Sequence, residues 1–161
     1  QNSFVVDGDI IPYYHFLYEE NLHVLLRRKK YWKARSNKLD DGSSLISFLM
    51  EETFSQFDSN ADFPVFERAV MLIIHYFSDN RRHDLDKPIV DCIRKTRIIR
   101  DDDYSNLSIF SVGQQDIKDC IEVFLVPFAY FVDFANQHFY ELTDFYTSES
   151  EFKTIKQVEE E

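Results

Sequence analysis

An uninterrupted apolar run near the middle of the chain constrains the fold more than any other feature. Residues 69–74 read Ala-Val-Met-Leu-Ile-Ile, and they lie between Pro64 and a polar stretch that begins at Ser78. A short, continuous apolar run bounded in this way is typical of a strand that is buried on both faces. We therefore expect a central strand within residues 64–77.

Three more strands are expected around this one. Residues 3–11 are rich in branched side chains and predict an opening strand that Pro12 closes. Residues 107–112 and 121–126 predict two strands, which we expect to form a hairpin around residues 113–119.

Apolar periodicity predicts three helices. The first begins at Ser43, and its apolar face is formed by Ile46, Leu49, Met50, Phe54 and Phe57. The second begins near Pro88, which suits a first helical turn because proline has no amide hydrogen to leave unpaired; its apolar face is formed by Ile89, Cys92, Ile93 and Thr96. The third covers 128–146, with a stripe of Phe128, Val132, Ala135, Phe139, Leu142 and Tyr146. Residues 13–37 fit either a helix or a long loop, and we expect the polar end beyond Thr147 to fray.

This element order predicts an α+β fold in which helices cover one mixed sheet. The 161 residues suffice for a single domain, and 3 glycines and 4 prolines leave no room for long flexible linkers. Two cysteines cannot form a disulfide framework, and the sequence shows no signal-peptide pattern, so we expect a cytoplasmic protein. The apolar stretches are too short to span a bilayer, so we expect no membrane association.

The charge is strongly segregated along the chain. Its formal sum is −11, from 29 acidic and 18 basic residues, which alone argues against binding nucleic acid. However, 14 of the 18 basic residues lie in two windows, 27–38 and 81–100, whereas the last 43 residues are acidic. The windows predict either a basic face that binds phosphate or two solvated helix faces. The candidate DNA-binding residues are Arg27, Arg28, Lys29, Lys30, Lys33, Arg81, Arg82, Arg94, Lys95 and Arg97.

Two groups of aspartates flank the second basic window. Asp84 and Asp86 follow the predicted central strand, and residues 101–103 are three consecutive aspartates. If one short helix brings these groups together, their carboxylates form a site for Mg²⁺, or for Mn²⁺, inside a basic rim. Such a site suits phosphodiester hydrolysis. Alternatively, Asp86 caps the helix at Pro88, Asp84 pairs with a nearby arginine, and residues 101–103 form a solvated turn.

The stretch 83–110, HDLDKPIVDCIRKTRIIRDDDYSNLSIF, resembles the core of the RusA-like Holliday-junction resolvases. Their pattern runs D-x-D-N-x-x-K, then a helix containing an Asp, then a D-D turn that leads into a strand. Asp84 and Asp86 match the first pair, Asp91 matches the helix Asp, and Asp101-Asp102 match the later pair. The sequence departs from the pattern after Asp86, where Lys87 follows directly, as though about three residues were missing.

The resemblance implies a homodimeric, Mg²⁺-dependent endonuclease that makes paired nicks in four-way DNA junctions, of bacterial or phage origin. Its catalytic residues would be Asp84, Asp86, Asp102 and Lys87, and its metal ligands Asp84, Asp86, Asp101 and Asp102. The resemblance covers residues 1–128 as an endonuclease domain and leaves 129–161 as a C-terminal aromatic helix and acidic tail. The aromatic helix is a candidate dimer contact.

Two other functions fit the sequence. The shortened loop at Lys87 is compatible with a DNA-binding relative that does not cleave, and the acidic tail is compatible with a protein-interaction domain. The histidines are less informative. His83 is the one beside the aspartates, while His15, His23, His75 and His138 show no ligand spacing and are expected to be core or surface residues.

Overall fold

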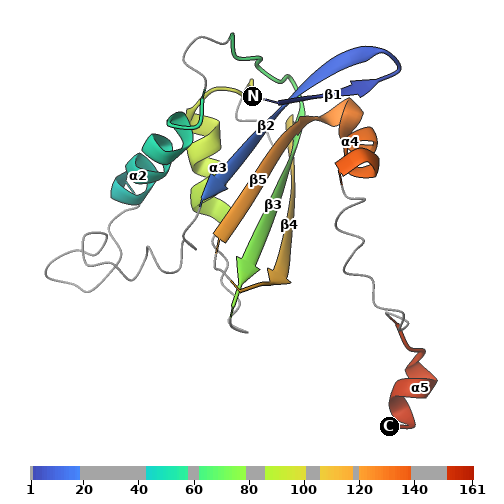
Figure 1. Ribbon diagram of the computed structural model, residues 1–161. Helices are drawn as coiled ribbons and strands as arrows, with labels where there is room; N and C mark the ends of the chain where they lie inside the picture. The colour runs from blue at the N-terminus through green and yellow to red at the C-terminus, as the bar shows by residue number, and fades with distance from the viewer. Residues whose placement is uncertain are drawn as a thin grey trace, which may run out of the picture. The chain divides into compact units, whose positions relative to one another are not determined.

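The computed structural model describes residues 2–18, 43–57, 62–78, 86–100, 106–117, 120–138 and 152–161. The chain divides into two compact units, Gln1–Phe131 and Val132–Glu161. The first unit holds every strand of the described part of the chain, together with the two helices that pack on the sheet (Figure 1).

The first unit is built on one mixed five-stranded sheet. Its strands are β1 (Asn2–Val6), β2 (Asp9–Tyr18), β3 (Ala69–Phe77), β4 (Leu107–Gln115) and β5 (Cys120–Pro127). They are arranged in the order β1-β2-β5-β3-β4 (Figure 1). β3 and β4 are parallel, and the other neighbouring pairs are antiparallel. The prediction of a mixed sheet covered by helices is confirmed.

β3 is the buried strand that the apolar run predicts, and it is an interior strand of the sheet, next to the edge strand β4. Its first six residues are buried, and it pairs with β5 on one side and β4 on the other. Ala69, Met71 and Ile73 are fully buried in the main core, which they share with Ile89 and Ile93 of the helix α3 (Asp86–Lys95). This packing places α3 over one face of β3.

The predicted hairpin of residues 107–112 and 121–126 is wrong. Both segments are strands, but β3 lies between them. β4 pairs with β3 in parallel, so α3 is the crossover that connects these two strands. After β4 the chain passes the end of β3, where the N–H of Asp116 donates to the carbonyl of Phe77 at 2.9 Å. The most apolar strand takes an interior position, where two strands flank it and helices cover one of its faces.

The predicted opening strand is two strands with a tight turn. Asp7 and Gly8 have φ values of 50° and 87°, and positive values at both positions are characteristic of a type I′ hairpin turn. Pro12 does not end a strand but lies inside β2, opposite Ser3. The proline is tolerated because β2 begins to pair with β5 only at Tyr14. β2 continues to Tyr18, so the start of segment 13–37 is a strand rather than a helix or loop.

The helix α2 (Ser43–Phe54) confirms the predicted start at Ser43, and Leu49, Met50 and Phe57 of the predicted apolar face lie in the core or pack against it. Leu49 is fully buried, whereas Phe54 is 47% exposed and Thr53 is fully buried. The Thr53 hydroxyl donates to the Leu49 carbonyl at 2.6 Å and accepts from the Tyr18 hydroxyl at 2.6 Å. These two bonds satisfy the polar group, so threonine can occupy the buried position.

The helix α3 carries Pro88 in its first turn and buries Ile89, Cys92 and Ile93 completely, as predicted. It packs beside α2. Burial raises the pKa of the Cys92 thiol, whose sulfur lies 3.5 Å from the Thr53 hydroxyl oxygen. The crossover helix and α2 therefore meet at a small polar contact inside the core.

The C-terminal region departs from the predicted helix over 128–146. A 3₁₀ turn, η3 (Phe128–Tyr130), precedes the helix α4 (Phe131–His138), and residues 139–146 lie outside the described part. The predicted stripe is wrong in register, because Val132 is 69% exposed while Phe134 is buried. Instead of fraying throughout, the end contains a short helix, α5 (Ile155–Glu159), which begins with a capping box formed by Thr154 and Gln157.

Among the described helices, none is long and apolar enough to cross a membrane.

Candidate functional site

The described part of the predicted acidic site lies at the start of α3, the helix that follows β3. Asp86 and Lys87 occupy the first turn of this helix, and β3 ends at Phe77. A carboxylate is stabilised in a first helical turn because the backbone N–H groups there carry partial positive charge. Asp86 is therefore placed where a negative side chain is favourable.

The Asp86 carboxylate is held by a histidine on the strand. Nε2 of His75 lies 2.5 Å from Oδ1 of Asp86, and because an ionised carboxylate can only accept, the imidazole donates. The two side chains are 14% and 24% exposed, so the contact is sheltered but not sealed from solvent. His75 lies on the same face of β3 as Met71 and Ile73, the face that α3 covers. The bond thus connects the end of the strand with the start of the helix.

This arrangement orients one carboxylate oxygen. Within the described segments Asp86 has His75 as its partner, and no bond from its side chain to the helix backbone is found there. A histidine that holds one oxygen of a carboxylate fixes the direction of the other oxygen, as outer partners do for metal ligands. Sequence reasoning missed His75 because its partner is eleven residues away, across a chain reversal. A histidine near the end of an otherwise apolar strand, followed by an acidic helix start, was the available signal.

The basic residues described around α3 are mostly solvent-facing. Lys87, Lys95 and Arg97 are exposed and Arg94 is half-buried. Arg97 adopts a left-handed conformation, with φ of 63°, in the turn after the helix. We find Arg100 in an ion pair with Glu67, both highly exposed, so this pair contributes little to stability. The exposed cations leave this helix able to contact a phosphate backbone.

The described residues on both sides of the second acidic group, 101–103, lie at the other end of β3. The N–H of Arg100 donates to the carbonyl of Phe66 at 2.8 Å, and Leu107 pairs with Ala69 at the start of the strand. His75 is six residues further along, which corresponds to about 20 Å at about 3.3 Å per residue. The described residues that flank 101–103 therefore lie far along the strand from Asp86.

Many predicted site residues lie outside the described part. They are Asp84, Asp101, Asp102, Arg27, Arg28, Lys29, Lys30, Lys33, Arg81 and Arg82. Within the segments that the structure describes, no three side chains of His, Cys, Asp or Glu are grouped so that they could hold a metal ion. The metal site, with Asp84, Asp86, Asp101 and Asp102 as its ligands, stays a prediction.

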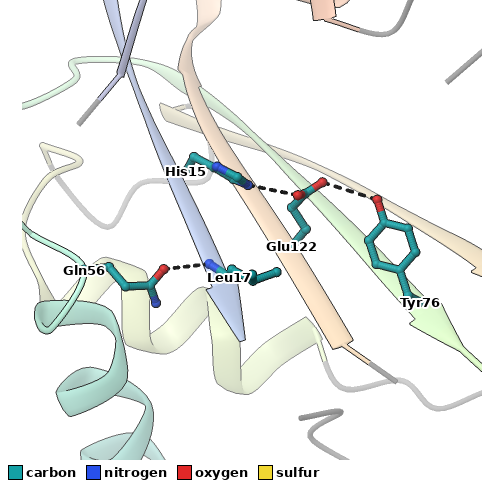
Figure 2. A network of polar contacts seen from close by, with 5 residues as sticks. All are labelled: His15, Leu17, Gln56, Tyr76 and Glu122. Atoms are coloured by element: carbon teal, nitrogen blue, oxygen red, sulfur yellow. Dashed lines mark hydrogen bonds and ion pairs between the residues drawn. The ribbon is translucent and has the colours of Figure 1, made fainter. Parts of the chain in front are cut away.

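A second polar cluster lies on the opposite face of the sheet (Figure 2). Nε2 of His15 on β2 donates to Oε2 of Glu122 on β5 at 3.0 Å, and the Tyr76 hydroxyl on β3 donates to Oε1 at 3.3 Å. The His15 ring stacks on Phe124, with centroids 4.4 Å apart. Burial, followed by the charge of Glu122, raises the pKa of Tyr76 to about 12. The cluster links three neighbouring strands and satisfies a half-buried carboxylate.

Near this cluster, a side-chain bond ties the turn after α2 to the sheet. The N–H of Leu17 on β2 donates to Oε1 of Gln56, just after the helix, at 2.7 Å (Figure 2). This bond satisfies a backbone donor near the end of β2.

Comparison with known proteins adds no relative. No protein-family model matches the sequence, and no curated protein is significantly similar to it.

Proposed function

We propose that this protein is a Mg²⁺-dependent, structure-selective endodeoxyribonuclease of the RusA-like type, which resolves four-way DNA junctions by paired nicks and acts as a homodimer. The observation that carries the proposal is the position of Asp86. Its carboxylate lies at the start of a helix with exposed cations, beside the end of β3, and His75 holds it by one oxygen. Asp86 belongs to the D-x-D pair on which the sequence resemblance rests.

The residues present fit a hard divalent cation. A carboxylate that is 24% exposed and oriented through one oxygen can offer its other oxygen to Mg²⁺, and Mn²⁺ accepts the same ligands. When bound, the metal would activate water and stabilise the departing oxygen of the phosphodiester. Asp84 and Asp86, two residues apart, would be its ligands at this end of β3. The resemblance adds Asp101 or Asp102 as a third carboxylate, but Arg100 and Leu107 are held at the other end of the strand, about 20 Å along it from His75, so the proposal rests on the first pair.

The basic residues would hold the substrate. Lys87 is exposed next to Asp86, so its ammonium group can contact the phosphate that is cut or stabilise the leaving oxygen. Lys95 and Arg97 lie further along the same helix and its terminal turn, where they can bind neighbouring phosphates. A four-way junction is close to two-fold symmetric, so a symmetric dimer would present one such site to each of two opposite strands.

The carboxylates can be tested one by one. A labelled four-way junction is incubated with Mg²⁺ and with each of D84N, D86N, D101N and D102N, and with D62N as a matched control on an exposed aspartate outside both acidic groups. We expect D84N and D86N to abolish nicking and D62N to nick like the wild type. Loss of nicking with D101N or D102N as well would add a third ligand from residues 101–103, as the resemblance implies. Junction binding without nicks by the wild type would instead support a DNA-binding relative that does not cleave.

A further inference from the structure

The outer edge strand β4 lacks the features that keep sheet edges from pairing. Within the described part of the chain, β3 is the strand that pairs with β4, and the other edge of β4 faces no strand. The strand is nine residues long and reads LSIFSVGQQ, with no charged residue and no proline. Natural edge strands are usually short, charged or interrupted, because an open row of backbone N–H and C=O groups recruits another strand. The opposite edge, β1, has five residues.

The side chains of β4 are exposed on both faces of the sheet. Residues 109–113 are all exposed, and Ile109, Phe110 and Val112 are 43%, 51% and 47% exposed. Since side chains alternate along a strand, Ile109 points to the face covered by the helices and Phe110 and Val112 point to the other. Solvent thus reaches apolar groups above and below an open backbone edge. This combination is typical of a strand that pairs with another chain.

The sequence of β4 is complementary to itself. Antiparallel pairing centred on Ser111 aligns all nine residues, from Leu107 opposite Gln115 to Gln115 opposite Leu107. Phe110 then lies opposite the partner's Val112, an aromatic and β-branched pair of the kind that stabilises antiparallel strands. Ile109 lies opposite the partner's Gly113, beside the Phe77 ring, whose Cε1 is 3.0 Å from the position of a Cβ on that glycine. Phe110 and Ile109 thus each meet an apolar group across the axis, Val112 in one case and the Phe77 ring that covers Gly113 in the other.

Phe110 is already ordered for such a contact. Its ring stacks on Phe131, with centroids 5.6 Å apart and planes at 3°. The absence of charge also removes any repulsion between two identical strands. A partner of a different kind would be expected to pair its own charged residues with charges on this edge, and β4 has no charged residue for such a pair.

We propose that β4 pairs antiparallel with β4 of a second copy of this chain, about a two-fold axis at Ser111, so that the two sheets become continuous. This inference specifies the homodimer that the proposed function includes and so deepens that function. Its test needs neither metal nor DNA, so a failure of the interface and a failure of the nuclease are told apart.

The test compares two double variants that differ only in the sign of one charge. In F110K/V112K, each introduced lysine faces another across the interface, whereas in F110K/V112E each lysine faces a glutamate of the partner. We expect sedimentation to show a wild-type dimer, dimerisation weakened by about 100-fold or more in F110K/V112K, and a dimer restored in F110K/V112E. I10K, on an exposed site of β2, is expected to leave the dimer intact.

Cross-linking tests the register. In a C120S background, S111C places two cysteine Cα atoms about 4.5–5.5 Å apart at the axis, within disulfide range. S108C separates them by about 20 Å, since each lies three residues from the axis at about 3.4 Å per residue. We expect oxidation to link S111C and not S108C. A monomeric wild type, a dimer that both charge variants leave unchanged, or equal cross-linking of the two cysteines would overturn the proposal.

Discussion

His75 on β3 and Asp86 on α3 are joined by a hydrogen bond of 2.5 Å between Nε2 and Oδ1. The bond links β3 to the first turn of the crossover helix α3, where the candidate site begins. It gives the imidazole a defined role, to hold a carboxylate in one direction. The sequence predicts His75 to be a core or surface residue, because it shows no ligand spacing. Its bond to Asp86 makes it a positioning residue in our proposal.

His75→Ala should weaken the response to Mg²⁺ without unfolding the protein. Loss of the donor lets the Asp86 carboxylate turn, and outer partners of metal ligands typically contribute about 10–100-fold to metal affinity or activity. The measurement is the nicking rate of a four-way junction against Mg²⁺ concentration, with His75→Gln as the conservative variant, whose side chain can still donate.

His15→Ala is the matched control, because His15 also donates to a carboxylate from a strand, but on the opposite face of the sheet. We expect its Mg²⁺ dependence to match the wild type. An unchanged Mg²⁺ dependence in His75→Ala would contradict the positioning role.

Thr53→Val should destabilise the fold by about 1–3 kcal/mol. The substitution keeps the shape but removes a hydroxyl that is fully buried and bonded to Leu49 and Tyr18, and it leaves the Tyr18 hydroxyl without its acceptor. Urea unfolding measures the change. Ser47→Ala, on an exposed site of the same helix, should stay within about 0.5 kcal/mol of the wild type. Equal stabilities for the two variants would show that the buried hydrogen bonds contribute nothing net.

Gly8→Ala should cost about 1 kcal/mol through backbone conformation alone. Gly8 has φ of 87°, and a Cβ there would meet nothing within 4 Å, so no steric clash contributes. Gly113→Ala makes the useful comparison, because there the new Cβ would lie 3.0 Å from the Phe77 ring at an ordinary φ. We expect faster hydrogen exchange in β1 and β2 for Gly8→Ala and none of this effect for Gly113→Ala. Exchange at the wild-type rate in Gly8→Ala would exclude a strained turn.

Stability should fall between pH 10 and about 12. Burial raises the pKa of Tyr14 to about 12, and burial with the Glu122 charge raises that of Tyr76 to about 12. In this window the unfolded chain has lost these protons while the folded chain still binds them, so rising pH favours unfolding, and the stabilisation is complete below pH 10. Chemical unfolding at pH 9, 10.5 and 12 should show a decrease that is smaller in Tyr76→Phe. A flat profile would contradict the burial of these phenols.

The parts of the fold that depend on local patterns could be predicted from the sequence. The apolar run defined β3, and the periodicity after Ser43 and Pro88 defined α2 and α3. The strand order could not be predicted, because the placement of β3 between β4 and β5 depends on which strand gains most from burial. An Asp-Gly pair marks the turn at Asp7-Gly8 in the sequence. The branched residues on both sides nevertheless have the pattern of one continuous strand, so the turn was not predicted.

The faces of the helices were harder to predict, because the chain has 16 phenylalanines and several competing stripes. Phe54 is exposed and Phe134 is buried, the reverse of what the simplest stripes suggest. The sequence did place Asp86 and Lys87 at the start of a helix that follows the apolar strand β3. For His75 the sequence offered only the position of a histidine near the end of an apolar strand, since its contact with Asp86 forms only when α3 packs back on β3.

Cleavage of a four-way junction is the direct test of the proposed nuclease activity. The wild-type protein and D86N, both shown to be folded, are incubated with a labelled junction or a linear duplex in the presence of Mg²⁺. We predict symmetric paired nicks in the junction by the wild type, none in the duplex, and none by D86N. A folded wild-type protein that leaves the junction intact, or a D86N variant that nicks as fast as the wild type, would contradict the account.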